Sequence, residues 1–221
     1  MTADSHDIVI TRPARDDEAE ELANVLESAF CDLPPTRWLL PDPDERCIRF
    51  SAYARIWVDH GLATGTVEVA ETGGGDLAGL TIWWREPAGE PTCYAERLAA
   101  AIGPEHMSRF EIFDQALHAA HPKREHLYLA FAAVDPFYQG CGYGTALLDR
   151  RHIDLDACKV PAYLVAASTQ ARELYLRHGY RDFGTTAIDL PSGPRMYPMW
   201  RHPITDGRCV EERPRDGEES Q

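Results

Sequence analysis

A glycine-rich segment lies between an apolar stretch and a pattern typical of a helix, and its residue types fit one kind of chemistry. It consists of Gln139, Gly140, Cys141, Gly142, Tyr143, Gly144 and Thr145. Alternate glycines allow a tight turn that points successive backbone N–H groups into one concavity. A helix that begins there adds the positive end of its dipole, which favours a phosphate. The segment therefore predicts a site for a phosphorylated cofactor, and a glycine-rich connection without a ligand is the alternative.

Two common nucleotide-binding patterns do not fit this segment. The dinucleotide fingerprint needs a glycine three residues after Gly142, where this chain has Thr145. No Gly-Lys-Ser or Gly-Lys-Thr follows the glycines, so a P-loop nucleotide hydrolase is not indicated. If the segment binds a phosphate, its site is therefore of a class other than these two.

The apolar stretch before the glycines predicts a strand that ends at Pro136, because proline has no backbone N–H to donate. Both of its alternating sets of side chains are apolar, so we expect both faces to be buried. We expect one face to carry Leu127, Leu129, Phe131 and Ala133, and the other to carry Tyr128, Ala130, Ala132 and Val134.

The pattern Gln/Arg-x-x-Gly-x-Gly/Ala, here Gln139 to Gly144, resembles the acetyl-CoA signature of the GNAT superfamily of N-acetyltransferases. A second segment, Ala162 to Gly184, is similar to that family's next strand, helix and glycine-aromatic turn. The resemblance implies an α/β GNAT fold with a mixed, mostly antiparallel sheet of six to seven strands and flanking helices. It also implies acetyl-CoA as co-substrate. Main-chain atoms of Ala132 and Val134 would pair with the pantetheine arm, and N–H groups from Gln139 to Thr145 would hold the pyrophosphate.

Tyr175 lies four residues before Gly179-Tyr180, where that family has the tyrosine that protonates the departing thiolate. A phenol with a pKa of about 10 suits this role, although a core aromatic at helical spacing is the alternative. Seven residues before Tyr175, relatives often have an Asn that contacts CoA, and this chain has Ser168. The resemblance thus implies Tyr175 as the general acid and a weaker cofactor contact at Ser168.

The general base stays open at the level of the sequence. An amine substrate arrives protonated, so a carboxylate, a histidine or a water chain has to accept a proton before attack. Many relatives, including the puromycin N-acetyltransferase group, have a Glu on the strand after the glycine-loop helix, where this chain has Val165. The candidates from other segments are Asp32, Glu111, Asp114 and His126. Deprotonation through water is an equal alternative.

The resemblance extends over the substrate half of the chain. AFCDLPPTRWLLPDPDER, AAIGPEHMSRF and LPSGPRMYPMWR are similar to segments of puromycin N-acetyltransferase and related antibiotic-modifying enzymes. This implies direct acetyl transfer to an amine of a small molecule of the antibiotic or natural-product type. We expect Trp83 and Trp84 on opposite faces of a strand, with one of them in the acceptor pocket. Two alternatives are a biosynthetic acyltransferase that uses a larger acyl-CoA or a carrier-protein thioester, and a CoA-binding domain without turnover.

The composition agrees with one enzyme domain. The 221 residues carry a net charge of −14, which discourages nucleic-acid binding and favours a cationic small substrate. No segment has the roughly twenty apolar residues that span a bilayer, and the N-terminus has no secretion pattern, so we expect a cytoplasmic protein without membrane contact. The six cysteines form no Cys-x-x-Cys pair, so we expect reduced thiols, no disulfide framework and no metal. The protein could be a monomer or a homodimer.

We expect a single domain at residues 1–203 and a disordered acidic tail at 204–221. The four prolines of residues 31–43 indicate an irregular loop, and Asp16 or Asp17 is expected to cap the first helix with Glu20 as its capping-box partner. The expected strands are Ile8–Thr11, Thr66–Ala70, Leu77–Trp84, His126–Val134, Ala162–Ala166, Arg181–Leu190 and Arg195–Trp200. The expected helices end near Phe30, span Asp44–His60, Thr92–Ile102 and Glu105–Ala119, end near Asp156, and span Thr169–Arg177.

Overall fold

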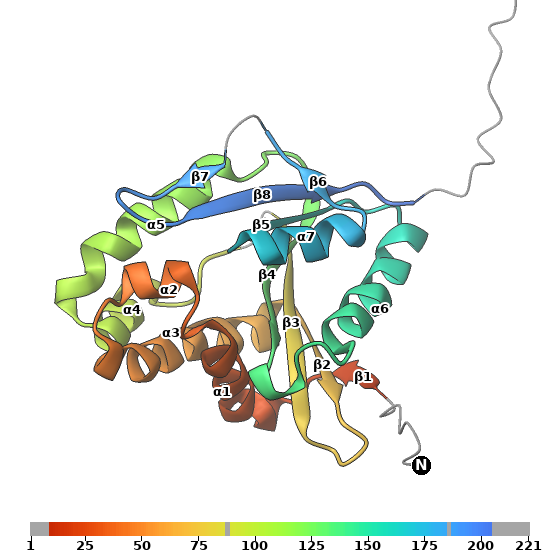
Figure 1. Ribbon diagram of the computed structural model, residues 1–221, viewed down its shortest axis with the longest axis horizontal. Coiled ribbons are helices and arrows are strands. Elements are labelled where there is room, and N and C mark those ends of the chain that lie inside the picture. The colour runs from red at the N-terminus through yellow and green to blue at the C-terminus, as the bar shows by residue number, and fades with distance from the viewer. Residues whose placement is uncertain (1–8, 87–88, 185–186, 205–221) are drawn as a thin grey trace, which may run out of the picture.

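The computed structural model describes residues 9–86, 89–184 and 187–204. Its strands form one mixed sheet in the order β1-β2-β3-β4-β5-β8-β6, and β7 pairs with β8 (Figure 1). Among the described strands, β4 and β5 make the parallel pair and the other neighbours are antiparallel. The strands are β1 (Ile10–Pro13), β2 (Thr66–Glu71), β3 (Leu77–Glu86), β4 (His126–Val134), β5 (Ala162–Ala166), β6 (Arg181–Asp182), β7 (Ile188–Asp189) and β8 (Arg195–Arg201).

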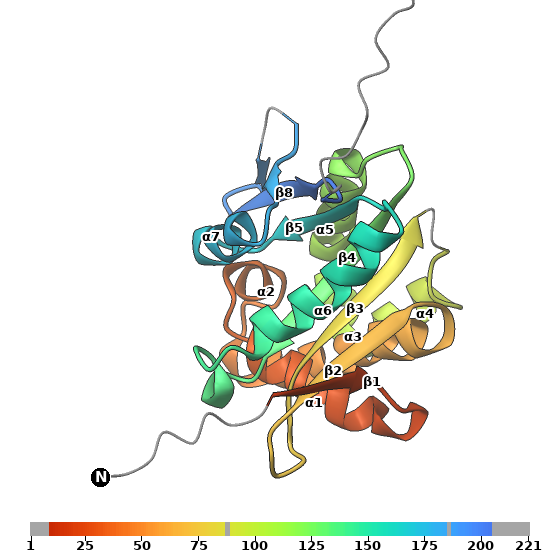
Figure 2. The same ribbon diagram turned by 90° about the vertical axis from the view of Figure 1, so that its right-hand side faces the viewer.

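Helices cover both faces of the sheet (Figures 1 and 2). A large apolar cluster joins α1, α3, α4 and α5 to one face, and a second joins α6 and α7 to the other. The helices are α1 (Ala19–Phe30), α2 (Pro34–Leu39), α3 (Pro43–Thr64), α4 (Tyr94–Ile102), α5 (Met107–Ala120), α6 (Tyr143–Ala157) and α7 (Thr169–Arg177). The expected α/β architecture, a mixed and mostly antiparallel sheet with flanking helices, is confirmed, and the bounds expected for β5 and α7 agree with the structure.

β4 carries a bulge that the alternating pattern does not reveal. Ile82 pairs with Phe131 and Trp83 pairs with Leu129, so Ala130 is an extra residue opposite β3. The extra residue reverses the alternation. Leu129 packs under α6 and α7, whereas Phe131 packs under α1 and α3. The expectation that Leu127, Leu129, Phe131 and Ala133 share a face is therefore wrong beyond Leu129, because it assumed an uninterrupted pleat.

The proline-rich segment after α1 is partly helical, contrary to the expected irregular loop. Pro34 and Pro35 occupy the first turn of α2, where a fixed φ and a missing N–H cost nothing. The next helix, α3, runs through Gly61 to Thr64 rather than ending at Gly61. Gly61 serves close packing, since a Cβ there would lie 2.7 Å from a methyl carbon of Ile82.

The N-terminal cap and the last strands also differ from expectation. Asp16 and Asp17 lie in a short 3-10 turn and cap nothing, and the Glu18 carboxylate accepts the backbone N–H of Arg15 at 2.7 Å. The expected capping box with Glu20 is therefore wrong. The strand expected at Arg181–Leu190 is two short strands, β6 and β7, and residues 185 and 186 between them lie outside the described part. The tail beyond Ile204 also lies outside it.

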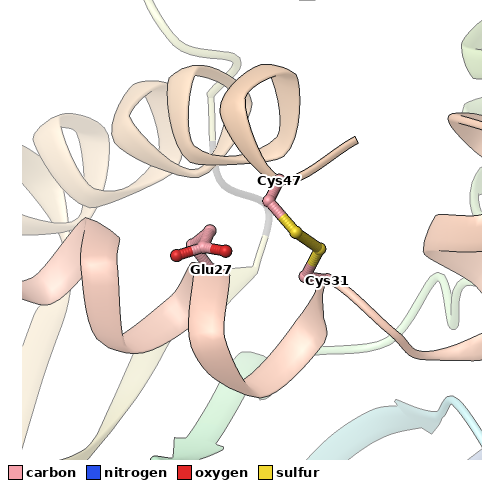
Figure 3. Close-up of side chains that lie close together, drawn as sticks. All are labelled: Glu27, Cys31 and Cys47. Carbon is pink, nitrogen blue, oxygen red and sulfur yellow. A yellow bond between two sulfur atoms is a disulfide. The ribbon is translucent and has the colours of Figure 1, made fainter. Parts of the chain in front are cut away.

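Cys31 and Cys47 form a disulfide, with a Cα–Cα distance of 5.4 Å, which corrects the expectation of reduced thiols throughout. Figure 3 shows the bridge between the end of α1 and the start of α3, with the Glu27 carboxylate beside it. The pairing depends on how α1 packs on α3, so spacing alone does not predict it. Cys93, Cys141 and Cys158 are free and exposed, whereas Cys209 is outside the described residues. No helix in the described part is long and apolar enough to cross a membrane.

Candidate active site

The sheet opens between β4 and β5. The two strands pair only from Leu127 to Leu129, while β4 continues to Val134 (Figure 1). The N–H of Asp135 donates to Ala78 of β3 at 2.9 Å. Because antiparallel residues alternate in the direction of their main-chain groups, Ala132 and Val134 point theirs away from β3, into the opening. The split therefore offers an exposed strand edge to which an extended ligand can pair.

The glycine loop closes one end of this opening. Gly140 and Gly142 have φ values of 80° and 92°, in the region that favours glycine. A Cβ on either residue would meet nothing within 4 Å, so the backbone conformation and not space requires glycine. Gly142 is the N-cap residue of α6 and no side chain caps the helix. The first N–H groups of α6 are thus arranged as a helix N-terminus that can bind an anion.

The side chains of the loop differ in what they can offer. Gln139 is exposed, and its amide donates to the carbonyl of Val134 at 3.1 Å. Tyr143 is 2 % exposed and its ring packs in the core beside α6, so only its main chain belongs to the loop. Cys141 is exposed, and its thiol donates to the Gln139 carbonyl at 3.8 Å. Thr145 is exposed in the first turn of α6, where its hydroxyl lies 3.5 Å from Nε2 of His178.

Tyr175 lies on α7, on the face of the sheet that α6 and α7 cover. It is 8 % exposed and belongs to the apolar cluster that also contains Leu129, Ala166 and, at its margin, Ala132. Burial raises the pKa of Tyr175 to about 12, so the phenol keeps its proton at neutral pH. The structure therefore brings a proton donor to the same cluster as the open edge of β4.

Ser168 has a structural function in this fold. Its hydroxyl oxygen accepts the backbone N–H of Ala171 at 3.1 Å and so caps α7. The hydroxyl hydrogen is still able to donate to another group, so the contact with CoA stays a prediction.

The opposite face of β4 carries aromatic side chains next to the bulge. Trp57 of α3 lies between Tyr94 of α4 and Phe131 of β4, with ring centroids 5.3 and 6.4 Å away. Phe30 at the end of α1 contacts Phe131 edge-on at 5.8 Å. The sequence interpretation missed Trp57 and Tyr94. The spacing of Phe50, Tyr53 and Trp57 along one helical stripe is the signal that could have found the first of them.

Asp114 is the expected base candidate that adjoins these rings. Its carboxylate accepts a hydrogen bond from the hydroxyl of Tyr94 at 3.2 Å. Burial raises the pKa of Asp114 to about 6, partly opposed by that hydrogen bond. A carboxylate with this pKa is ionised at neutral pH and is a better proton acceptor than an ordinary aspartate.

The other candidates are less suitably placed. Glu111 is exposed, and Asp32 is exposed and paired with Arg37 and Arg46. His126 is fully buried at the start of β4, directly before the part that pairs with β5. Its ring nitrogens contact the carbonyl of Arg124 and the ring of His121, and burial lowers its pKa. Val165 of β5 packs against the buried cluster of Ile188, Leu190 and Met196, and its side chain has no group that accepts a proton.

The tryptophans of β3 lie on opposite faces, as expected. Trp83 packs under α6 and α7, and Trp84 packs under α3. Both are buried core residues, and the ring of Trp84 contacts that of Trp57 at a centroid distance of 5.7 Å. Trp38 of α2 instead donates its indole N–H to the carbonyl of Pro191 at 3.1 Å. A lining role for Trp83 or Trp84 in an acceptor pocket stays a prediction.

Known proteins are similar to this chain in sequence or in fold. Residues 111–182 match the family model described as an acetyltransferase (GNAT) domain, a range that contains the open edge of β4, the glycine loop and Tyr175. The fold is similar to a Corynebacterium glutamicum protein described as histone acetyltransferase HPA2 and related acetyltransferase, at 26 % identity, with a TM-score of 0.69 over 90 % of this chain and 98 % of that one.

Two further structures are similar in fold. An agmatine N-acetyltransferase is 18 % identical, with a TM-score of 0.62 over 89 % of this chain and all of that one. A mosquito arylalkylamine N-acetyltransferase-like protein is 16 % identical, with a TM-score of 0.56 over 88 % of this chain and all of that one. Residues 111–182 thus match a GNAT acetyltransferase domain, the chain has a GNAT fold, and it is an enzyme of the N-acetyltransferase type.

Proposed function

We propose that the protein transfers an acetyl group from acetyl-CoA directly to an amine of a small molecule. The observation that carries this proposal is the open edge of β4, with Tyr175 on one face of the sheet and Asp114 beside aromatic rings on the other. A phenol that can donate a proton and a carboxylate that can accept one thus lie on opposite faces of one strand. Direct transfer in a ternary complex requires both functions.

The residues present fit acetyl-CoA. Main-chain groups of Ala132 and Val134 are oriented to pair with the amide groups of an extended pantetheine arm. The N–H groups from Gln139 to Thr145 would bind the pyrophosphate, with Ser168 as an additional donor. Bound acetyl-CoA would supply the acetyl group as a reactive thioester.

In this mechanism one side chain accepts a proton from the acceptor amine and another donates a proton to the leaving group. Asp114 takes a proton from the ammonium group, directly or through water, and leaves a neutral amine that can attack. As the new C–N bond forms and the C–S bond breaks, the Tyr175 hydroxyl donates its proton to the departing sulfur. The amine nitrogen loses its second proton through water to the Tyr175 oxygen, which restores the phenol, and Asp114 releases the first proton to solvent. No acyl-enzyme intermediate is needed, so the exposed thiol of Cys141 has no part in the reaction.

The acceptor would be a cationic amine of the antibiotic or natural-product type. The net charge of −14, the Asp114 carboxylate and the rings of Trp57 and Tyr94 all favour a positively charged molecule. The sequence resemblance to the puromycin N-acetyltransferase group supports a small-molecule acceptor. The agmatine and arylalkylamine N-acetyltransferases among the similar folds support an amine.

The test is a panel of amines assayed by release of the CoA thiol. It should contain agmatine, arylalkylamines, aminonucleosides and amino acid amides, with acetyl-CoA and longer acyl-CoA donors in parallel. We expect saturable turnover of at least one cationic amine with acetyl-CoA. Faster turnover with a longer acyl donor would identify the biosynthetic alternative. Tight CoA binding without thiol release from any pair would contradict the proposal and favour a binding domain.

A further inference from the structure

Three side chains with metal-binding atoms meet where α6 contacts the end of α7, outside the acyl-transfer groups described above. Asp149 and His152 are three residues apart on α6 and so share one face of the helix. His178 is the C-cap residue of α7. One carboxylate oxygen and one nitrogen from each imidazole all lie within 4.8 Å of one another. The Nδ1 atom of His178 is 3.2 Å from an oxygen of Asp149.

His152 has the surroundings of a ligand imidazole. It is buried, and its Nε2 atom lies 3.2 Å from the hydroxyl of Tyr180. The Tyr180 hydroxyl oxygen has lone pairs that can accept a hydrogen bond. With Nε2–H donating to Tyr180, the lone pair is on Nδ1. Metal-bound histidines usually hold their second nitrogen in this way.

The positive charge next to the cluster is balanced by a carboxylate, so it does not oppose the binding of a cation. Arg201 adjoins the cluster, and its Nε donates to the His178 carbonyl at 3.3 Å. Its other two nitrogens bind the Asp156 carboxylate at 2.7 Å each, which balances its charge. The side chain of Asp149 is 59 % exposed, so an ion and a completing water molecule can reach the cluster from solvent. The hydroxyl of Thr145, in the first turn of α6, is 3.5 Å from the other ring nitrogen of His178.

We propose that Asp149, His152 and His178 form a binding site for a divalent transition-metal ion. Two imidazoles and one carboxylate match Zn²⁺, with water as the fourth ligand, and match Mg²⁺ or Ca²⁺ poorly. The ion would join α6, which begins at the glycine loop, to α7, which carries Tyr175. It would therefore brace the two helices beside the acyl-CoA site. The sequence predicts no metal because its ligands come from two helices and follow no local spacing.

Titration of the full-length protein with Co²⁺ tests the site, with Zn²⁺ as competitor. No reductant is added, so that Cys31 and Cys47 stay paired. We expect one Co²⁺ ion with visible d–d absorption and no intense thiolate charge-transfer band, and displacement of that ion by Zn²⁺. Asp149→Asn and His178→Gln should each weaken binding on the order of 100-fold, because each removes a ligand. Asp154→Asn is the matched control, since Asp154 lies on α6 and pairs with Arg150.

Thermal unfolding supplies a second measurement that does not depend on activity. Zn²⁺ should raise the midpoint of the wild type and of Asp154→Asn, and should not raise that of Asp149→Asn. The exposed position of Asp149 means that its isosteric replacement leaves the fold intact, which circular dichroism verifies. A thiolate band would place the ion on cysteines such as Cys158 and overturn the proposal. Equal affinity in Asp149→Asn and the control, or no binding at ~0.1 mM metal, would also overturn it.

Discussion

The two faces of β4 are built on different principles. On the donor side, the groups that would hold acetyl-CoA are main-chain atoms of β4 and of the glycine loop, and their directions follow from a strand split and from two glycines with positive φ. On the acceptor side, the groups are side chains from α1, α3, α4 and α5. A site made of backbone leaves a continuous motif in the sequence, whereas a site made of side chains from several helices does not.

Tyr175→Phe tests the one side chain on which the donor side depends chemically. We expect turnover to fall by about 100-fold or more, because the departing thiolate loses its proton donor. The affinity for CoA should change little, since the ring remains in its apolar cluster. Thiol release at saturating substrates and calorimetric titration with CoA separate the two quantities. Unchanged turnover would show that Tyr175 is only a core aromatic.

The donor side is also where the sequence predicted most. β5 and α7 have the expected bounds, and the glycine loop lies between a strand and a helix as expected, because each of these features is encoded by consecutive residues. The bulge at Ala130 could not be predicted, since it depends on the pairing of β4 with β3. The disulfide and the position of Asp114 beside Tyr94 likewise arise from helix packing, which no local pattern encodes.

Asp114→Asn tests the acceptor side. In the wild type we expect kcat/KM to fall as the pH drops through about 6, because protonation removes the base. The variant should lose this limb of the profile and retain roughly 1 to 10 % of the activity at neutral pH. Glu111→Gln, an exposed neighbour on α5, is the control and should keep the wild-type profile. A variant that retains the acidic limb would assign the base to another group or to water.

Gly142→Ala tests whether the backbone conformation sets the donor site. The φ of 92° strains any residue with a Cβ by about 1–2 kcal/mol. A loop that relaxes from this strain no longer presents its N–H groups, so we expect CoA affinity to fall about 10-fold. Gly73→Ala is the control, because Gly73 lies in an exposed turn without positive φ and a Cβ there meets nothing within 4 Å. Equal CoA affinity in the two variants would separate the glycine loop from cofactor binding.

Loss of the disulfide should have the smallest effect on activity. It should also change the acceptor side of β4 and leave the donor side unchanged. The bridge between Cys31 and Cys47 encloses α2. Trp38 of α2 and Phe113 of α5 both pack against the large apolar cluster on the acceptor side. The double variant Cys31→Ser/Cys47→Ser frees this segment, so binding an acceptor must order it again at a cost of about 0.5–1 kcal/mol. We expect the KM of the acceptor to rise about threefold while CoA affinity stays constant, because the donor groups lie on β4, α6 and α7.

Steady-state kinetics with each substrate varied in turn measure both values, with Cys158→Ser as the control. A matching loss of CoA affinity would mean that the two faces of β4 are mechanically coupled. The main-chain groups of the donor side would then depend on the side-chain packing of the acceptor side.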